Sequence, residues 1–287
     1  MIRAILEASI RRGTFTSTFA ALLVGATASV FVPSAIAEDK QEKPIKALLV
    51  CGGGYHDYGK QKDIISKGIA ARANVEFTIA NGPDKVMNPL YENADWAKGF
   101  DVIIHDECTA DVKDLAVIER ILKPHKDGLP AIILHCGMHC YRSDGWNKKE
   151  LTPWMALTGL QTTGHGKQIP IEIKFVDKDS ALTKGLADWT TGNEELYNNI
   201  VGNVADTAKP LAHGKQITKD KDGKEKVDET IVVWTNTYNG KTKVFGTTIG
   251  HNNVTCEDPR YLDMITRGLL WSVDKLDDAH LKKVAAK

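Results

Sequence analysis

The sequence predicts an α/β protein with a doubly wound, mostly parallel sheet and antiparallel additions in its C-terminal half. In the first half, short apolar segments typical of buried parallel strands alternate with segments of helical periodicity. Such alternation indicates βαβ units with right-handed crossovers. In the second half, strand-like segments are separated by short or charged connections, which favours antiparallel or mixed pairing.

The first predicted strand is Ala47–Val50, and the glycine run at 52–54 marks a tight loop before a helix over Gln61–Ala73. The other elements of this half are the strands Val75–Ala80, Asp101–His105 and Ala131–Leu134 and the helix Val112–Leu122. Ligands of such sheets bind outside the carboxyl ends of the strands. We therefore expect the functional site at that edge.

The strands predicted for the second half are Ile169–Phe175, Pro210–His213, Thr230–Trp234 and Lys243–Thr248. The Asp222-Gly223 pair lies in the middle of a charged segment and indicates the tip of a hairpin. An amphipathic helix over Tyr261–Val273 is expected to close the domain.

The N-terminal segment has the three parts of a secretory signal peptide. Arg3, Arg11 and Arg12 form a basic start, 19–32 is apolar, and Ala35-Ile36-Ala37 is a small-residue cleavage site. The alternative, a membrane anchor, needs about 20 apolar residues, more than this segment offers. We predict a signal peptide over 1–37, a leader over 38–44, one domain over 45–276 and a tail over 277–287. The processed protein is then periplasmic or extracellular and has no integral membrane segment.

Composition is that of an ordinary globular domain, with 42% hydrophobic and 26% charged residues. The whole chain is formally neutral, and removal of the signal peptide leaves a net charge of about −2. Without a basic stripe the chain lacks the electrostatic pattern of a nucleic-acid-binding protein. The sequence predicts no nucleic-acid partner and sets no oligomeric state.

Four histidines lie where the predicted strands reach the carboxyl edge. His56 follows the first strand, His105 ends the third, and His135 and His139 follow the strand that ends at Leu134. A single histidine at such a place is usually structural. Their clustering around the expected ligand crevice favours a functional site.

The segment 134–142 occupies a predicted strand-to-helix turn, the geometry that exposes a nucleophile in elbow-type hydrolases. Arg142 in this turn either holds a carboxylate or a polarised oxygen of a ligand, or forms a salt bridge within the protein.

Five cysteines also follow strands or edge motifs: Cys51, Cys108, Cys136, Cys140 and Cys256. An exported protein can form disulfides, but spacing does not assign the pairs. In a doubly wound sheet the third strand lies between the first and fourth, so Cys108 can pair with Cys51, Cys136 or Cys140. Buried free thiols and ligation of a soft metal are the alternatives.

Taken in order, these motifs resemble the ThuA-like (trehalose utilisation) family. The matching pieces are the glycine loop with His56, the strand end near Asp106, the turn His135–His139, Gly164-His165, Asn193–Tyr197, Trp234, Val244–Asn252 and Arg267–Trp271. They extend over 47–276, and it is their order and spacing that carries the resemblance.

The resemblance implies a flavodoxin-like fold similar to that of class I glutamine amidotransferases, which carry a nucleophilic cysteine at the elbow after strand four. Aligning the elbow glycine with Gly137 places His135 at the nucleophile position and Cys136 one residue away. No His-x-Glu pair follows His251. The resemblance therefore does not extend to amidotransfer.

Family membership implies instead a role in carbohydrate metabolism, including routes through keto-sugars. His135, His165, Glu195 and His251 offer imidazoles and a carboxylate, which serve either as general acid and base or as ligands of a divalent metal such as Zn²⁺. The candidate catalytic residues are His135, His139, Glu195 and His251. The candidate substrate-binding residues are His56, Arg142, His165, Tyr197 and Trp234. Trp146 and Trp154 are further rings expected in or beside the edge loops.

Three functions are consistent with these residues. The first is an exported enzyme, an isomerase, lyase or hydrolase, that acts on a carbohydrate. The second is a carbohydrate-binding module that keeps the pocket without turnover. The third is a cysteine-dependent hydrolase that uses Cys136.

Overall fold

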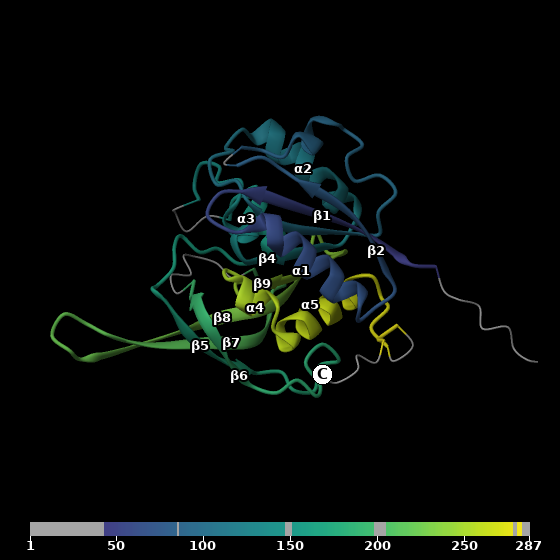
Figure 1. The fold of residues 1–287 in the computed structure, drawn as a ribbon. Coiled ribbons are helices and arrows are strands. Elements are labelled where there is room, and N and C mark those ends of the chain that lie inside the picture. The colour runs from purple at the N-terminus through teal and green to yellow at the C-terminus, as the bar shows by residue number, and fades with distance from the viewer. Residues whose placement is uncertain (1–42, 85, 147–150, 198–204, 278–279, 283–287) are drawn as a thin grey trace, which may run out of the picture. The chain divides into compact units, whose positions relative to one another are not determined.

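The computed structural model describes residues 43–84, 86–146, 151–197, 205–277 and 280–282. The predicted signal peptide lies outside these residues, as does the leader up to residue 42. The described residues form one nine-stranded sheet in the order β2-β1-β3-β4-β9-β8-β7-β5-β6 (Figure 1). The strands are β1 (Ile45–Gly53), β2 (Val75–Asn81), β3 (Val102–Cys108), β4 (Ala131–Leu134), β5 (Gln168–Phe175), β6 (Trp189–Glu195), β7 (Lys209–Lys219), β8 (Glu225–Tyr238) and β9 (Thr242–Thr247).

The pairing confirms the predicted fold class. β1, β2, β3, β4 and β9 pair in parallel, and their order is the one typical of flavodoxin-like sheets. β9 pairs antiparallel with β8, which leads through β7 and β5 to β6 by antiparallel pairs. We predicted that all strands of the C-terminal half are antiparallel or mixed additions to the sheet. This prediction was incomplete, because β9 pairs with β4 and completes the parallel part.

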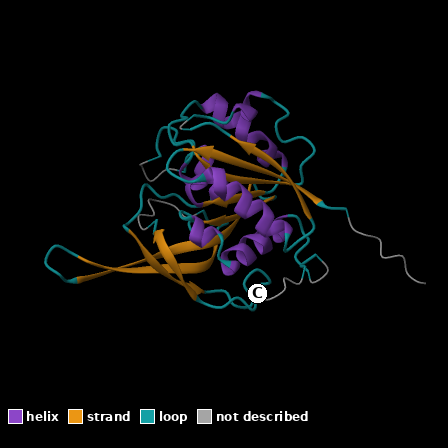
Figure 2. Cartoon of the chain, in the orientation of Figure 1, coloured by secondary structure: helices purple, strands orange, loops and turns teal. Residues whose placement is uncertain are grey.

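Helices cover both faces of the sheet (Figures 1 and 2). The α-helices are α1 (Tyr58–Ala70), α2 (Leu115–Asp127), α3 (Pro153–Thr158), α4 (Asn253–Cys256) and α5 (Pro259–Ser272), and the 3₁₀ helices are η1 (Pro89–Glu92) and η2 (His135–His139). Apolar residues of α1 and α5 form one core, and those of α2 and α3 form the other. Alternate residues of β1 enter the two cores: Leu49 one, Leu48 and Val50 the other. The parallel strands, which are continuous apolar segments in the sequence, are thus buried on both faces of the sheet.

Local sequence signals define the longer helices. Asp114 accepts hydrogen bonds from the backbone amides of Ala116 and Val117 at the start of α2, and Gly128 ends that helix in the left-handed region, at φ 118°. Asp258 caps α5 in the same way, followed by Pro259 in the first turn.

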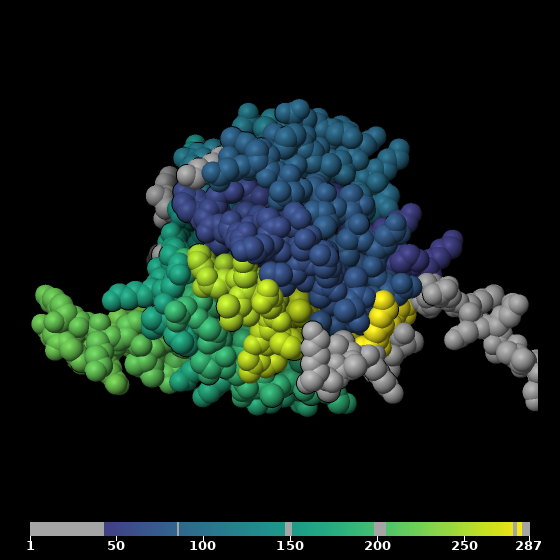
Figure 3. Space-filling view, in the orientation of Figure 1, coloured from purple at the N-terminus to yellow at the C-terminus, as the bar shows by residue number. Residues whose placement is uncertain are grey.

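β7 and β8 form a long hairpin that extends past the neighbouring strands, as the green segment of Figure 3 shows. Its tip contains Gly223 at φ 79°, which confirms the predicted turn. At the other end of the domain, Leu281 forms a β-bridge with Ala73, so the predicted tail contacts the domain. Among the described residues, no helix is long and apolar enough to cross a membrane.

Candidate functional site

Three histidines from separate loops converge at the carboxyl edge of the parallel strands. His56 follows β1, His135 follows β4 and His251 follows β9. The ring centroid of His56 lies 4.8 Å from that of His135 and 4.8 Å from that of His251, and the last two are 5.4 Å apart. One ligand atom of each lies within 4.8 Å of the others. The structure therefore brings together three residues separated by nearly 200 positions.

His135 occupies the sharp turn predicted from the elbow motif. Its φ is 42°, a left-handed value that is uncommon for a residue other than glycine. Two residues later, a Cβ at Gly137 would lie 2.5 Å from the carbonyl oxygen of His105, so only glycine lets the turn pack on β3. The expected helix after the turn is instead the short η2.

The hydrogen bonds of His135 set its tautomer. Nδ1 lies 2.6 Å from the carbonyl oxygen of Thr248, so Nδ1 carries the proton and donates it to that bond. Nε2 faces the site, 3.3 Å from the hydroxyl of Tyr197. A histidine oriented in this way is suited to bind a metal or to accept a proton.

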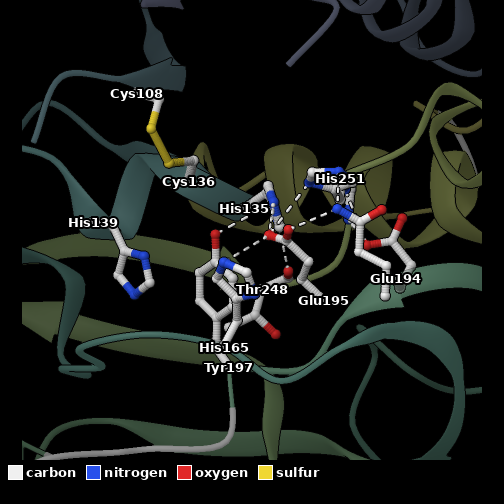
Figure 4. A network of polar contacts seen from close by, with 12 residues as sticks. Cys108, His135, Cys136, His139, His165, Glu194, Glu195, Tyr197, Thr248 and His251 are labelled. Atoms are coloured by element: carbon white, nitrogen blue, oxygen red, sulfur yellow. Dashed lines mark hydrogen bonds and ion pairs between the residues drawn. A yellow bond between two sulfur atoms is a disulfide. The ribbon is translucent and has the colours of Figure 1, made fainter. Parts of the chain in front are cut away.

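Glu195, at the end of β6, lies among three imidazoles (Figure 4). Its Oε2 is 3.6 Å from His135 Nε2, 3.6 Å from His165 Nε2 and 3.3 Å from His251 Nδ1. Burial raises the pKa of this carboxyl, but hydrogen bonds and charge from His135 and His251 outweigh burial and hold the pKa well below its usual range. Glu195 is therefore the anion of the site.

The imidazoles differ in their tendency to take up a proton. Burial, followed by the charges of His135 and His251, lowers the pKa of His56 to about 2, so His56 stays neutral. Burial also acts to lower the pKa of His251, but Glu195 raises it further than burial lowers it. His56 Nδ1 is buried and has no hydrogen-bond partner among the described residues.

Glu194, which the sequence analysis did not single out, positions the loop that carries His251. Its fully buried carboxylate accepts hydrogen bonds from the backbone amides of Gly250, His251 and Asn252 at 3.0 to 3.3 Å. From the other side, Gln61 of α1 donates to the carbonyl oxygens of Gly250 and His251. Neighbouring residues of a strand point to opposite faces of the sheet. The adjacent Glu194-Glu195 pair was therefore the sequence signal from which two carboxylates with separate roles could have been predicted.

Gly250 allows this loop to approach His135. Its φ is 128°, and a Cβ there would lie 2.7 Å from the hydroxyl oxygen of Tyr261 and 3.6 Å from Cβ of His135. A larger residue would push the His251 loop away from the site.

Four histidines, His56, His139, His165 and His251, border a pocket of about 490 Å³, within the usual range for small-molecule sites. Its lining includes His56, His139, Arg142, His165, Glu195, Tyr197 and His251. A larger hollow of about 840 Å³ lies at the amino-terminal edge of the sheet and is lined by residues such as Lys46, Asp101 and Lys243. No histidine lines that hollow, so we assign the site to the carboxyl edge.

The predicted site residues His139 and Arg142 line the pocket together with Tyr197. The buried ring of His139 stacks on Tyr197 at a centroid distance of 4.2 Å and bonds to the hydroxyl of Thr162. Burial lowers the pKa of His139 well below its ordinary value, so this ring is neutral. Arg142 donates from Nε to the carbonyl oxygen of His139, and its guanidinium stacks 3.9 Å from the ring centroid of Trp146.

Trp234 does not lie at the edge where it was predicted. Its indole is fully buried and donates to the carbonyl oxygen of Thr158 at 2.7 Å. β8 extends through Tyr238, which makes Trp234 an interior strand residue. Trp154 is likewise buried and donates to the carbonyl oxygen of Gly137 at 2.9 Å. Neither ring reaches the pocket.

His105 was also predicted at the edge and is instead a core residue. β3 continues to Cys108, so His105 lies within the strand. Its Nδ1 is 2.8 Å from Glu107 Oε1, and its Nε2 is 3.1 Å from Nε2 of His125. The buried partners satisfy this side chain without a ligand.

The cysteine arrangement excludes a nucleophilic role for Cys136 in the oxidised protein. Cys136 forms a disulfide with Cys108, with a Cα–Cα distance of 5.3 Å, joining the end of β3 to η2 (Figure 4). Cys51, Cys140 and Cys256 are free and buried. Burial raises the pKa of Cys51 to about 12, so its thiol is not reactive near neutral pH. The disulfide therefore argues against the cysteine-hydrolase hypothesis.

The comparisons with known proteins agree with this fold. The model of the ThuA family, described as trehalose utilisation, matches residues 46–272. A protein described as ThuA-like from Parabacteroides merdae is 18% identical, with a TM-score of 0.64 over 85% of this chain and 94% of that chain. Another from Bacteroides uniformis is 15% identical, with a TM-score of 0.58 over 87% of this chain and 98% of that chain. No curated protein sequence matched. At these identities the structural likeness shows the fold alone.

Proposed function

Because the chain belongs to the ThuA family, we propose that it is an exported protein that acts on a carbohydrate, a keto-sugar, by metal-assisted acid–base chemistry. One observation carries the proposal: His56, His135 and His251 converge beside the ionised Glu195. His56, His251 and Glu195 line the open pocket, and the buried His135 lies next to them. The family description supports a carbohydrate substrate, and the N-terminal segment supports export.

The three converging histidines fit a divalent transition metal such as Zn²⁺. Imidazole nitrogens are common zinc ligands, and catalytic zinc sites use three protein ligands. His56 offers a buried Nδ1 without a hydrogen bond, and the bond of His135 to Thr248 directs Nε2 toward the site. A metal held there would supply a Lewis acid that polarises a carbonyl oxygen. The sequence had suggested His165 and Glu195 as ligands; in this proposal both serve in proton transfer.

The remaining polar groups provide the proton transfer. His165 has a half-exposed imidazole, a type of group that serves as general acid or base, and its Nε2 lies 3.6 Å from Glu195 Oε2. Burial raises the pKa of Tyr197 well above its ordinary value, so its hydroxyl stays protonated and can donate to a substrate oxygen. The His139 ring stacks on the Tyr197 ring and fixes its position. The hydrogen that leaves is the one on the carbon next to the sugar carbonyl.

Deuterium exchange tests this function without knowledge of the product. The purified protein is loaded with Zn²⁺ and incubated in D₂O with keto derivatives of mono- and disaccharides, and deuterium beside the carbonyl is followed by NMR. We expect catalysed exchange that His165→Ala and Glu195→Gln each reduce by about 100-fold or more, the usual contribution of a positioned acid or base. His213→Ala, on β7 and outside the pocket lining, is the matched control.

Two results would contradict the proposal. Exchange that is equal in the control, His165→Ala and Glu195→Gln proteins would show that these residues do not transfer the proton. Tight binding of keto-sugars by a zinc-loaded protein without any exchange would instead support the carbohydrate-binding module.

A further inference from the structure

Among the described residues, two groups of side chains with the spacing of metal ligands share His56. One is the histidine group described above, with His135 and His251. The other consists of His56 and the two cysteines of the disulfide, Cys108 and Cys136, and one ligand atom of each lies within 4.8 Å of the others. In the oxidised protein the two sulfurs are bonded to each other (Figure 4). Because the thiolate is the form of cysteine that binds metals, this second group can act only after reduction.

The glycine loop that carries His56 packs directly on Cys108. The backbone amide of Gly54 donates to the carbonyl oxygen of Cys108 at 3.4 Å, and a Cβ at Gly53 would lie 2.2 Å from the same oxygen. Only glycine allows so close an approach of the two backbones. His56 is therefore held beside Cys108 by contacts that do not depend on the disulfide.

The turn that carries Cys136 is also held on β3 without the cross-link. The buried thiol of Cys140 donates to the carbonyl oxygen of Glu107 at 3.1 Å and accepts from the backbone amide of Thr109 at 3.2 Å. These bonds join the end of η2 to the end of β3 on either side of Cys108. Reduction would therefore leave the two former disulfide sulfurs near each other.

The three side chains border the open pocket of the candidate site. An ion held by them at the pocket wall would keep a further coordination position open toward the pocket. Three protein ligands with one open position are typical of catalytic zinc sites, and one known ligand set of this kind is two cysteines and one histidine. The ligand types and their placement thus match a functional metal site.

We propose that Cys108, Cys136 and His56 form a second metal site, present only when the disulfide is reduced, that binds a thiophilic divalent ion such as Zn²⁺ or Cd²⁺. Two molecules of a thiol reductant supply one electron and one proton to each sulfur and leave joined as their own disulfide. Both cysteines release their protons to solvent when the ion binds, so two thiolates balance its charge. Sulfur ligands favour such ions over Mg²⁺ and Ca²⁺. This site requires neither a carbohydrate substrate nor a metal on the histidine group.

Cobalt spectroscopy on the whole processed protein tests the site, because Co²⁺ bound by thiolates has an intense sulfur-to-metal charge-transfer absorption in the near ultraviolet. A phosphine reductant is used, since a thiol reductant would itself bind the ion. We expect the reduced wild type to show this absorption at about one Co²⁺ per chain, and Zn²⁺ to abolish it by displacement. The oxidised protein should lack it.

Two cysteine variants identify the sulfurs. Cys108→Ser/Cys136→Ser under the same reductant should lose the absorption, although it keeps the three free thiols of the chain. Cys51→Ser is the matched control, because Cys51 packs in the same small cluster as the two cysteines but belongs to neither metal group. Its absorption should equal that of the reduced wild type. Circular dichroism checks the fold of each protein.

His56→Ala tests the third ligand and keeps the cross-link, so it carries the test even where the double cysteine variant does not fold. In the reduced state this variant should bind Zn²⁺ at least about 100-fold more weakly than wild type, because loss of a supporting partner alone costs 10- to 100-fold. His251→Ala should bind it like the wild type through the sulfur site.

The sulfur site would be overturned by a reduced wild type without the absorption, by an equal absorption in the double cysteine variant, or by full affinity in reduced His56→Ala. The histidine centre fails in a different way. If the oxidised protein binds no ion while the reduced protein shows the absorption, the sulfur site stands and the metal centre of the proposed function falls.

Discussion

Asp106 is a buried carboxyl group whose surroundings disfavour its charge. It is 4% exposed, and its Oδ2 has no hydrogen-bond partner among the described residues. Burial, aided by the charge of Glu107, raises its pKa from 3.8 to about 7. The folded protein therefore holds this proton more tightly than the unfolded chain does.

This shift predicts a loss of stability as the pH rises. The contribution of a protonated Asp106 is complete below about pH 4 and is lost as the pH approaches 7. Asp106→Asn removes the titration, so its stability relative to wild type should increase by about 4 kcal/mol between pH 4 and pH 8. Urea unfolding at both pH values measures the difference. The exposed Asp222→Asn is the control, and a relative stability of Asp106→Asn that does not change with pH would contradict the prediction.

At the scale of elements, the Cys108–Cys136 disulfide connects β3 to η2, the turn that contains His135. It closes a loop with a sequence separation of 28. Cross-links of this length stabilise folded proteins by about 2–4 kcal/mol, mainly by restricting the unfolded chain.

The double variant Cys108→Ser/Cys136→Ser should therefore lose about 2–4 kcal/mol of unfolding free energy. Guanidinium unfolding with and without reductant provides the measurement. Reductant should lower the stability of the wild type to a similar extent and leave that of the double variant unchanged. A wild type as stable in reductant as without it would show that the cross-link contributes nothing.

Element boundaries explain which site residues the sequence could predict. His56, His135 and His251 follow strands whose ends are marked by glycine or a sharp turn, so their place at the edge was predictable. His105 was misplaced because the polar sequence His105–Glu107 does not resemble a buried strand, although tertiary contacts bury all three side chains. β6 was missed because Thr190–Glu195 contains few apolar residues. The role of Glu194 depends on the loop over 250–252, which only folding brings next to β6.

At the scale of the whole domain, the site needs both halves of the chain. The parallel half, completed by β9, supplies the three converging histidines, and β6 of the antiparallel half supplies Glu195. His251 is positioned from both sides, by Gln61 of α1 and Glu194 of β6. The antiparallel strands thus place the Glu195 carboxylate beside the edge where the three histidines of the parallel part converge.

Metal binding tests the central claim, that His56, His135 and His251 act as one metal centre, most directly. The processed protein is stripped with chelator, reloaded with Zn²⁺, desalted and analysed by elemental mass spectrometry, with circular dichroism to confirm folding. We predict about one ion per chain in the wild type and in His213→Ala. We predict an affinity at least about 100-fold lower in each alanine variant of the three histidines. A wild type that binds no ion, or folded His56→Ala, His135→Ala and His251→Ala proteins that keep it at full affinity, would contradict the account.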